Sequence, residues 1–169
     1  HGCNSVIATK TALKMGEYIR KFRPQHMIAT PAFYEILIDS EEMEGFDLSH
    51  MLTLGSGGDS MNAGLEAKLE AFRESHGLRY PLAQGYGMSE CSPRITTSDF
   101  SESNKYSNGV IIGVDEVRCI DGEIQIKGPS VMKGYYKMPE ETANAFTADG
   151  FLHTGDLGYI KDNHIYLIG

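Results

Sequence analysis

The stretch Met51-Leu52-Thr53-Leu54-Gly55-Ser56-Gly57-Gly58-Asp59 decides the fold, because a short apolar strand predicted at Met51–Leu54 runs directly into a glycine-rich turn. After the turn, apolar residues recur at helical spacing opposite a charged face, at Leu65, Leu69 and Phe72. A strand, a tight turn and an amphipathic helix in this order form the repeating unit of a parallel sheet covered by helices. We therefore expect an α/β fold.

The neighbouring residues repeat this unit. Ser5–Ala8 and His26–Ala29 are predicted as short buried strands, and Arg79–Leu82 as a further short strand. Thr30-Pro31 is a favourable helix start, because threonine can cap a helix and proline suits its first turn. Apolar spacing predicts two helices with inner faces formed by Met15, Ile19 and Phe22, and by Phe33, Ile36 and Leu37.

The chain is expected to contain two parts joined by a polar segment. Residues 1–98 carry the strand and helix units of a mostly parallel, helix-covered sheet. Residues 99–108 are polar and are predicted as a linker or long loop. Residues 109–169 contain mostly strand patterns, such as the alternation in Glu123–Lys127, and predict a small β-rich subdomain with the form of a distorted barrel.

Composition and charge exclude several classes of function. The net charge is −8 and Lys and Arg do not cluster, so binding to nucleic acid is not expected. No apolar run reaches the ~20 residues that cross a bilayer, so no transmembrane segment is expected. The three cysteines, Cys3, Cys91 and Cys119, are odd in number and far apart, which is typical of reduced thiols in a cytoplasmic protein.

The motif Gln84-Gly85-Tyr86-Gly87-Met88-Ser89-Glu90 combines groups that suit a nucleotide. Tyr86 lies between two glycines and can stack on a base, and Ser89 can donate to a phosphate oxygen. Glu90 can hold Mg²⁺, which prefers one or two carboxylates with phosphate oxygens and waters. A tyrosine packed under a turn and an ordinary Ser/Glu helix cap explain the same residues, so both interpretations stay open.

Two further stretches carry polar groups beside glycines. In His153-Thr154-Gly155-Asp156-Leu157-Gly158, the two oxygens of Asp156 match a vicinal diol such as ribose, and a turn aspartate that bonds its own backbone is the alternative. Gly57, Gly58 and Asp59 follow a strand, where open parallel sheets bind ligands. They do not form a Walker loop, because no Gly-Lys-Ser/Thr follows, and a tight turn without a ligand explains them as well.

The order and spacing of these stretches resemble the adenylate-forming superfamily, which contains acyl-CoA synthetases, 4-coumarate–CoA ligases, luciferases and peptide-synthetase adenylation domains. The resemblance covers essentially the whole chain. It is strongest in Gly57-Gly58, Gln84–Glu90, Gly122-Glu123-Ile124 with Gly128-Pro129, Gly134-Tyr135-Tyr136 and His153–Gly158. The family reaction joins a carboxylate to ATP, which gives acyl-AMP and pyrophosphate, and then transfers the acyl group to a thiol.

The resemblance implies a role for each motif residue. Tyr86 would stack on adenine, and Asp156 would bind ribose. Ser89 would contact phosphate and Glu90 would hold Mg²⁺, so these two residues would form the catalytic pair. The other positions that the resemblance places near the nucleotide or the acyl group are Gly57, Gly58, Asp59, Gly85, Gly87 and Met88.

The family also has parts that this chain lacks. No Ser/Thr/Gly-rich phosphate loop ending in Lys-Gly occurs, and the chain ends where the family continues into an arginine, a hinge and a mobile domain. We therefore expect an internal portion of a ligase that uses ATP, Mg²⁺ and CoA to activate a fatty or aryl acid. Without the missing N- and C-terminal parts, the isolated chain is expected to be inactive.

Three alternatives remain open at this point. The thiol acceptor could belong to a carrier protein, as in a peptide-synthetase-type adenylation domain. Gly87-Met88-Ser89-Glu90-Cys91 nearly matches the nucleophile elbow of α/β-hydrolases, with Ser89 as the nucleophile and with His153 and either Asp149 or Asp156 as partners. Finally, the chain could be a nucleotide-binding module without catalytic activity.

Overall fold

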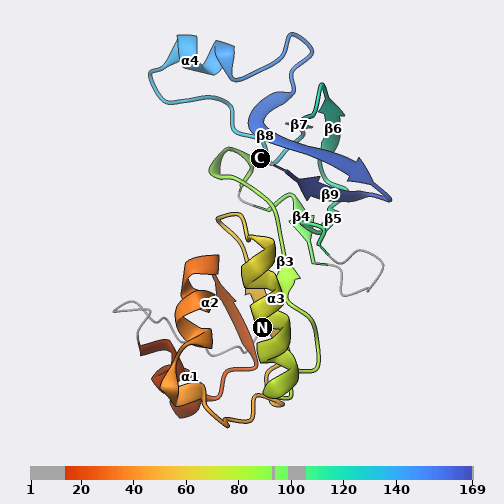
Figure 1. Ribbon diagram of the computed structural model, residues 1–169. Coiled ribbons are helices and arrows are strands. Elements are labelled where there is room, and N and C mark those ends of the chain that lie inside the picture. The colour runs from red at the N-terminus through yellow and green to blue at the C-terminus, as the bar shows by residue number, and fades with distance from the viewer. Residues whose placement is uncertain (1–13, 93, 99–105, 169) are drawn as a thin grey trace. The chain divides into compact units, whose positions relative to one another are not determined.

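The computed structural model describes residues 14–92, 94–98 and 106–168 (Figure 1). The chain divides into two compact units, His1–Ala83 and Gln84–Gly169, which are called here the helical unit and the sheet unit. The predicted strand Ser5–Ala8 and most of the predicted linker lie outside the described residues. No helix in the described ranges combines the length and the apolar character that crossing a membrane requires.

The helical unit alternates strands and helices, as its sequence predicts. The strands of its sheet follow the order β1-β2-β3, and β1 pairs with β2 in parallel. Its elements are α1 (Met15–Phe22), β1 (His26–Ala29), α2 (Pro31–Ile38), the short 3₁₀ helix η2 (Glu41–Met43), β2 (Thr53–Ser56), α3 (Ala63–Ser75) and β3 (Ala83–Gln84). This confirms the α/β class with a parallel sheet.

Strand boundaries in this unit differ from the prediction. Strand β2 covers Thr53–Ser56, two residues beyond the expected Met51–Leu54, because β1 starts at His26 and His26 pairs with Thr53. The strand expected at Arg79–Leu82 is displaced to β3. Apolar composition locates a strand, whereas its ends are set by the partner strand with which it forms hydrogen bonds.

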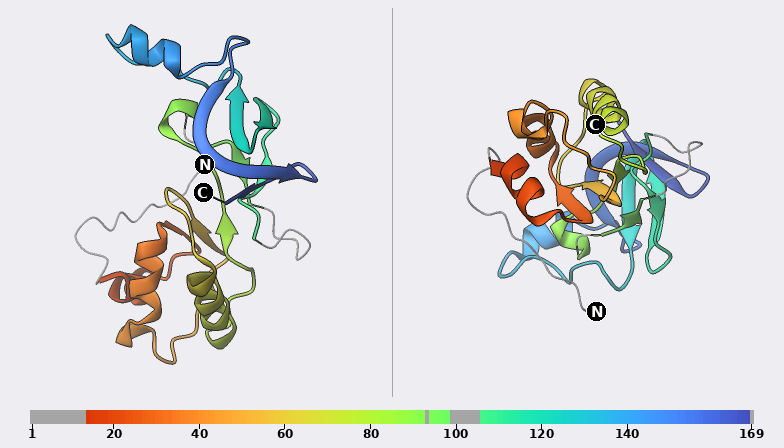
Figure 2. Two further views of the ribbon diagram at one scale, coloured as in Figure 1. Left: turned by 45° about the horizontal axis from the view of Figure 1, so that its top comes forward. Right: turned by 90° about the horizontal axis from the view of Figure 1, so that it is seen from below.

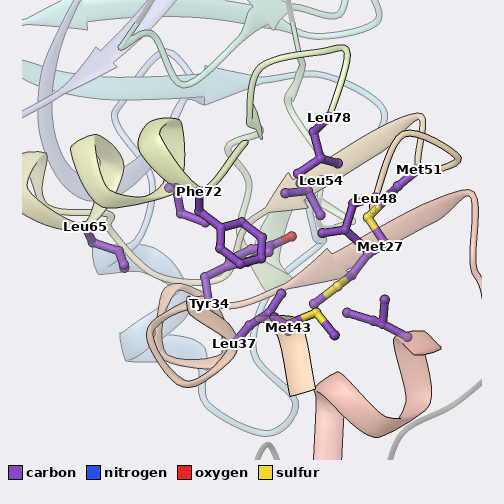
Figure 3. Packing of buried hydrophobic residues seen from close by; sticks show 12 residues of the cluster. Met27, Tyr34, Leu37, Met43, Leu48, Met51, Leu54, Leu65, Phe72 and Leu78 are labelled. Atoms are coloured by element: carbon purple, nitrogen blue, oxygen red, sulfur yellow. The ribbon is translucent and has the colours of Figure 1, made fainter. Parts of the chain in front are cut away.

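The core of the helical unit lies between the sheet and its helices. Leu65, Leu69 and Phe72 of α3 are buried as predicted. In α2, however, the inner face consists of Pro31, Tyr34 and Leu37, whereas Phe33 and Ile36 are only half-buried. Tyr34 is fully buried, and its hydroxyl is satisfied there because it donates to the carbonyl of Gly55 at 2.7 Å. Figure 3 shows Tyr34, Leu37 and Phe72 within this core.

The sheet unit is built on one six-stranded antiparallel sheet in the order β4-β5-β9-β8-β7-β6. Because β4 and β6 end this order, the described sheet is open, and the predicted distorted barrel is not closed. Its strands are β4 (Thr96–Thr97), β5 (Val110–Ile111), β6 (Glu116–Ile120), β7 (Glu123–Lys127), β8 (Leu152–Lys161) and β9 (His164–Leu167). The unit also contains a 3₁₀ helix, η3 (Ser89–Cys91), and the short helix α4 (Pro139–Asn144).

Strand β8 is bent along its length, as the blue arrow in Figure 2 shows. Its pairing with β7 is irregular at the bend: Glu123 lies opposite Leu157 and Gln125 opposite His153. Two steps along β7 therefore correspond to four steps along β8, and the extra residues form a bulge. Gly155 lies in this bulge with a φ of 76°, a conformation that glycine adopts without steric cost.

Candidate functional site

Tyr86 is held in the sheet unit by both its backbone and its hydroxyl. Its N–H donates to Thr96 Oγ1 at 2.7 Å, and its carbonyl accepts from the N–H groups of Ile95 and Thr96. The side chain is 8% exposed, and its hydroxyl donates to Asp156 Oδ2 at 2.6 Å. Burial and then this hydrogen bond raise the pKa of Tyr86 above its ordinary value, so the hydroxyl keeps its proton at neutral pH.

Asp156 projects from the bulge of β8, where side chains replace missing strand hydrogen bonds. Its N–H donates to Thr154 Oγ1 at 3.1 Å, and that hydroxyl donates in turn to the carbonyl of Ile124 at 2.6 Å. The Asp156 side chain is half-buried. The structure thus brings Asp156 to Tyr86. Its carboxylate accepts from this distant residue, whereas the contact within its own turn is made by its backbone N–H, which differs from the interpretation of a turn aspartate whose side chain bonds its own backbone.

Ser89 and Glu90 lie in the short helix η3. Ser89 is exposed, whereas Glu90 is half-buried and its Oε1 accepts from the Tyr135 hydroxyl at 2.9 Å. This hydrogen bond raises the pKa of Tyr135. The carbonyl of Glu90 accepts from the N–H of Met132 at 2.7 Å, which anchors the helix to a second loop of the same unit.

The other predicted residues fall into two groups. Gly85, Gly87 and Met88 flank Tyr86 and η3 in the sheet unit, and all three are half-buried. Gly57, Gly58 and Asp59 form the turn after β2 and belong to the helical unit. Gly58 has a φ of 84°, and Asp59 Oδ1 accepts from the next N–H, of Ser60, at 2.8 Å.

A pocket of about 440 Å³ lies beside β1 in the helical unit. Its lining is mainly apolar and includes Tyr18, Phe22, Ile28 and Phe33. None of the predicted site residues lines it, so the motif residues and this pocket are separate features of the chain.

The geometry does not assemble the triad of a hydrolase. His153 Nδ1 lies 2.9 Å from Glu123 Oε2, not beside either expected aspartate. Asp149 instead receives two hydrogen bonds from Arg118, at 2.6 and 3.1 Å, and Asp156 receives one from Tyr86. The described residues thus give His153 a glutamate partner, with both candidate aspartates engaged by other side chains.

The sequence motifs did not assign roles to three residues that hold the site together. Thr96 supports the backbone of Tyr86, Tyr135 bonds Glu90, and Glu123 accepts from the N–H of Gly155 at 3.1 Å. Glu123 and Tyr135 stand in glycine-containing stretches that contribute to the resemblance, which is a signal of importance but not of contact. No sequence period connects residues this far apart.

The described residues contain no group of three His, Cys, Asp or Glu side chains that could hold a metal ion. Glu90 by itself offers one carboxylate. Such a donor does not form a protein cage, but it fits Mg²⁺ that is held mostly by phosphate oxygens and waters.

The chain is similar to proteins of a known family and to solved structures. The family described as AMP-binding enzyme matches residues 1–136. Luciferin 4-monooxygenase of Luciola mingrelica is 29% identical over 89% of this chain, and the long-chain-fatty-acid–CoA ligase of Bacillus subtilis (strain 168) is 32% identical over 89%. The crystal structure of ATP-bound MatB from Rhodopseudomonas palustris matches 97% of the chain at 25% identity, with a TM-score of 0.80.

The chain covers only part of the length of each of these relatives. The chain spans 29% of the Luciola protein, 28% of the Bacillus ligase and 34% of the MatB chain. These proteins therefore include large regions that have no counterpart in the 169 residues of this chain.

Proposed function

We propose, from the premise that this chain belongs to the AMP-binding enzyme family, that it is a portion of an ATP-dependent acid–thiol ligase. The enzyme would activate a carboxylic acid, fatty or aryl, as acyl-AMP and would then transfer the acyl group to CoA. The ligase named among its relatives supports this class of reaction. The chain spans under a third of that ligase, so the proposal assigns the activity to a larger protein of which this chain would be a portion.

The observation that carries the proposal is the hydrogen bond between Tyr86 and Asp156, which are 70 residues apart. Adenine and ribose are joined by one covalent bond, so the residues that contact them must be neighbours. The structure makes Tyr86 and Asp156 neighbours at 2.6 Å. Asp156 would accept hydrogen bonds from the ribose hydroxyls, and Tyr86 would stack on adenine.

The burial of Tyr86 limits the access of adenine to its ring. Tyr86 is only 8% exposed, so stacking requires that the residues covering its ring move aside. Gly85 and Gly87 flank the ring, and glycine permits such movement at low steric cost. The hydrogen bonds to Thr96 and Asp156 would meanwhile keep the ring in place.

The remaining motif residues would act on the phosphates and the acid. The exposed hydroxyl of Ser89 can donate to a phosphate oxygen, and Glu90 would hold Mg²⁺ through one carboxylate. When bound, the ion supplies charge screening between the attacking carboxylate and the anionic phosphates. Gly57, Gly58, Asp59 and Met88 would contribute to the base and acyl surfaces.

The family match removes the α/β-hydrolase hypothesis and leaves two related ones. A carrier-protein thiol could replace CoA as the acceptor, because acyl-AMP formation is the same in both cases. A module that binds nucleotide without catalysis also remains a candidate. A cytoplasmic location belongs to the proposal too, and rests on the odd number of separated cysteines.

ATP–pyrophosphate exchange tests the proposal. The product of the complete reading frame that encodes this chain should exchange labelled pyrophosphate into ATP with at least one acid from a panel of fatty, aryl and amino acids. The 169-residue chain alone should bind ATP weakly and show no exchange. Exchange by the isolated chain would contradict the expected inactivity, and absence of exchange with every acid would contradict the ligase.

Product analysis separates the acceptors. Addition of CoA to an active reaction should yield the acyl-CoA thioester. Acyl-AMP that accumulates with CoA present, but is consumed by a phosphopantetheinylated carrier protein, would favour the alternative. Nucleotide binding without exchange would identify the non-catalytic module.

A further inference from the structure

One carboxylate joins β7 to the bulge of β8. Glu123 Oε1 accepts from the N–H of Gly155 at 3.1 Å, while Oε2 accepts from Gln125 Nε2 at 3.0 Å and lies 2.9 Å from His153 Nδ1. The Glu123 side chain is 21% exposed, so water competes weakly for these contacts. Both oxygens of this carboxylate are therefore engaged by neighbours in the same sheet.

The position of these contacts matters because the regular ladder is interrupted there. Between the pairs Gln125–His153 and Glu123–Leu157, the bulged residues of β8 exceed what β7 can pair. Glu123 supplies a side-chain acceptor for Gly155 N–H in place of a strand carbonyl. Glycine has many accessible backbone conformations because it lacks a Cβ. This acceptor therefore helps to hold Gly155 in its observed conformation, which has a positive φ.

Asp156 is the next residue after the one that Glu123 holds. The backbone at this point is held by Glu123, which accepts from the N–H of Gly155, and by the Thr154 hydroxyl, which accepts from the N–H of Asp156. We propose that Glu123 is a positioning residue for the nucleotide ribose, which acts by holding the β8 bulge so that Asp156 faces the ribose hydroxyls. This inference rests on the proposed function.

The charge state of Glu123 suits this role. Burial alone would raise the pKa of its carboxyl group, but hydrogen bonds from Gln125, His153 and Gly155 outweigh burial and lower it. Glu123 is thus an ionised acceptor at neutral pH. An ionised acceptor forms a stronger hydrogen bond with an N–H than a neutral one does.

The test measures preference for the ribose hydroxyls in the product of the complete reading frame. ATP–pyrophosphate exchange is measured with ATP and with 2′,3′-dideoxy-ATP, and the ratio of their kcat/KM values is compared among variants. The unsubstituted enzyme should prefer ATP by about 100-fold, as expected for hydrogen bonds to a carboxylate. Glu123→Ala should reduce that preference to about tenfold or less, with an unchanged KM for the carboxylic acid.

Two further variants make the result specific. Glu123→Gln keeps an oxygen that can accept from Gly155 but places an amide NH2 opposite Gln125 Nε2, so it should restore part of the preference. Glu116→Ala removes an exposed glutamate from the first position of β6 and should leave the preference unchanged. The ratio does not depend on the fraction of folded enzyme, because both nucleotides are measured on the same sample.

The outcomes separate this inference from the proposed function. If Glu123→Ala lowers exchange with both nucleotides equally, Glu123 is only structural and the inference is wrong. It is also wrong if the unsubstituted enzyme uses both nucleotides equally well. If the unsubstituted enzyme shows no exchange with any acid, the proposed function fails, and the inference fails with it.

Discussion

The two compact units of this chain are stabilised in different ways. In the helical unit, Tyr34 is the sole side chain with a polar atom other than sulfur among the twelve residues of the buried cluster. Of the six buried polar or charged residues in the described ranges, five lie in the sheet unit: Thr96, Ser107, Asp115, Gln125 and His164. Apolar packing thus dominates one unit, whereas buried hydrogen bonds between distant residues shape the other.

This difference teaches where a site can be built. Apolar contacts have no strict direction, so they hold helices on a sheet without aiming any single side chain. Hydrogen bonds depend on distance and angle, so a network of them can fix the direction of individual groups. The pair Tyr86 and Asp156 lies in the unit that uses such a network.

The largest expected effect concerns the apolar core of the helical unit. Leu37 is fully buried, so Leu37→Ala should lower the free energy of unfolding by about 2–5 kcal/mol through lost burial and a cavity. The measurement is urea unfolding of the 169-residue chain followed by far-ultraviolet circular dichroism. Ile28→Ala is the control, because Ile28 is 86% exposed and should change the value by about 0.5 kcal/mol at most. Equal effects of the two variants would break the comparison.

The second effect concerns the buried hydrogen bonds of the sheet unit. Thr96 is fully buried, accepts from the N–H of Tyr86 and donates to the carbonyl of Asn108. Thr96→Val has a similar shape but leaves both backbone groups without this partner, so it should cost about 1–3 kcal/mol of unfolding free energy. Calorimetric unfolding measures this change. Thr96→Ser keeps the hydroxyl and should cost less, and a reversed order would show that the methyl group matters more than the hydrogen bonds.

The third effect separates the ring of Tyr86 from its hydroxyl. Tyr86→Phe keeps the ring but removes the donor to Asp156. In the product of the complete reading frame, the KM for ATP should rise about tenfold, which corresponds to about 1.4 kcal/mol. The KM for the carboxylic acid should stay the same. Steady-state exchange kinetics measure both, and a change confined to the acid would place Tyr86 at the acyl group instead.

The smallest effect is a dependence on pH. Burial, followed by the nearby Asp115 and Glu90, raises the pKa of the Cys91 thiol from 9.0 to about 11. A raised thiol pKa means that the folded state favours the neutral form. The resulting stability is fully present below pH 9 and is lost as the pH rises through 11.

Cys91→Ala removes this titration, so its urea midpoint should fall less than that of the unsubstituted chain over the same pH interval. Midpoints measured at several pH values across the interval give the comparison. Parallel curves for the two proteins would show that Cys91 does not contribute.

Much of the helical unit could be predicted because its signals are local. The spacing of Leu65, Leu69 and Phe72 identified the buried face of α3, and that prediction is confirmed. The prediction for α2 was confirmed at Leu37 but wrong at Phe33, because it favoured Phe33 over Tyr34, whose hydroxyl finds a partner only when Gly55 approaches. Strand ends were also displaced, because β2 begins where β1 offers a partner.

The candidate site was also predicted only in part. The motifs named Tyr86 and Asp156 separately, and the resemblance proposed roles for both. Their hydrogen bond, and the contacts of Glu123 and Tyr135, did not follow from any motif. These residues are brought together by the order of the strands and by the bulge in β8.

The sequence by itself determined the family, the α/β class and the identity of the motif residues, because local spacing and motif order are properties of the chain alone. Only the tertiary structure decided that the antiparallel sheet stays open and that Glu123 holds the turn before Asp156. The physical reason is range. Apolar periodicity acts over a few residues, whereas a hydrogen bond between distant residues forms only after strand register has set their positions.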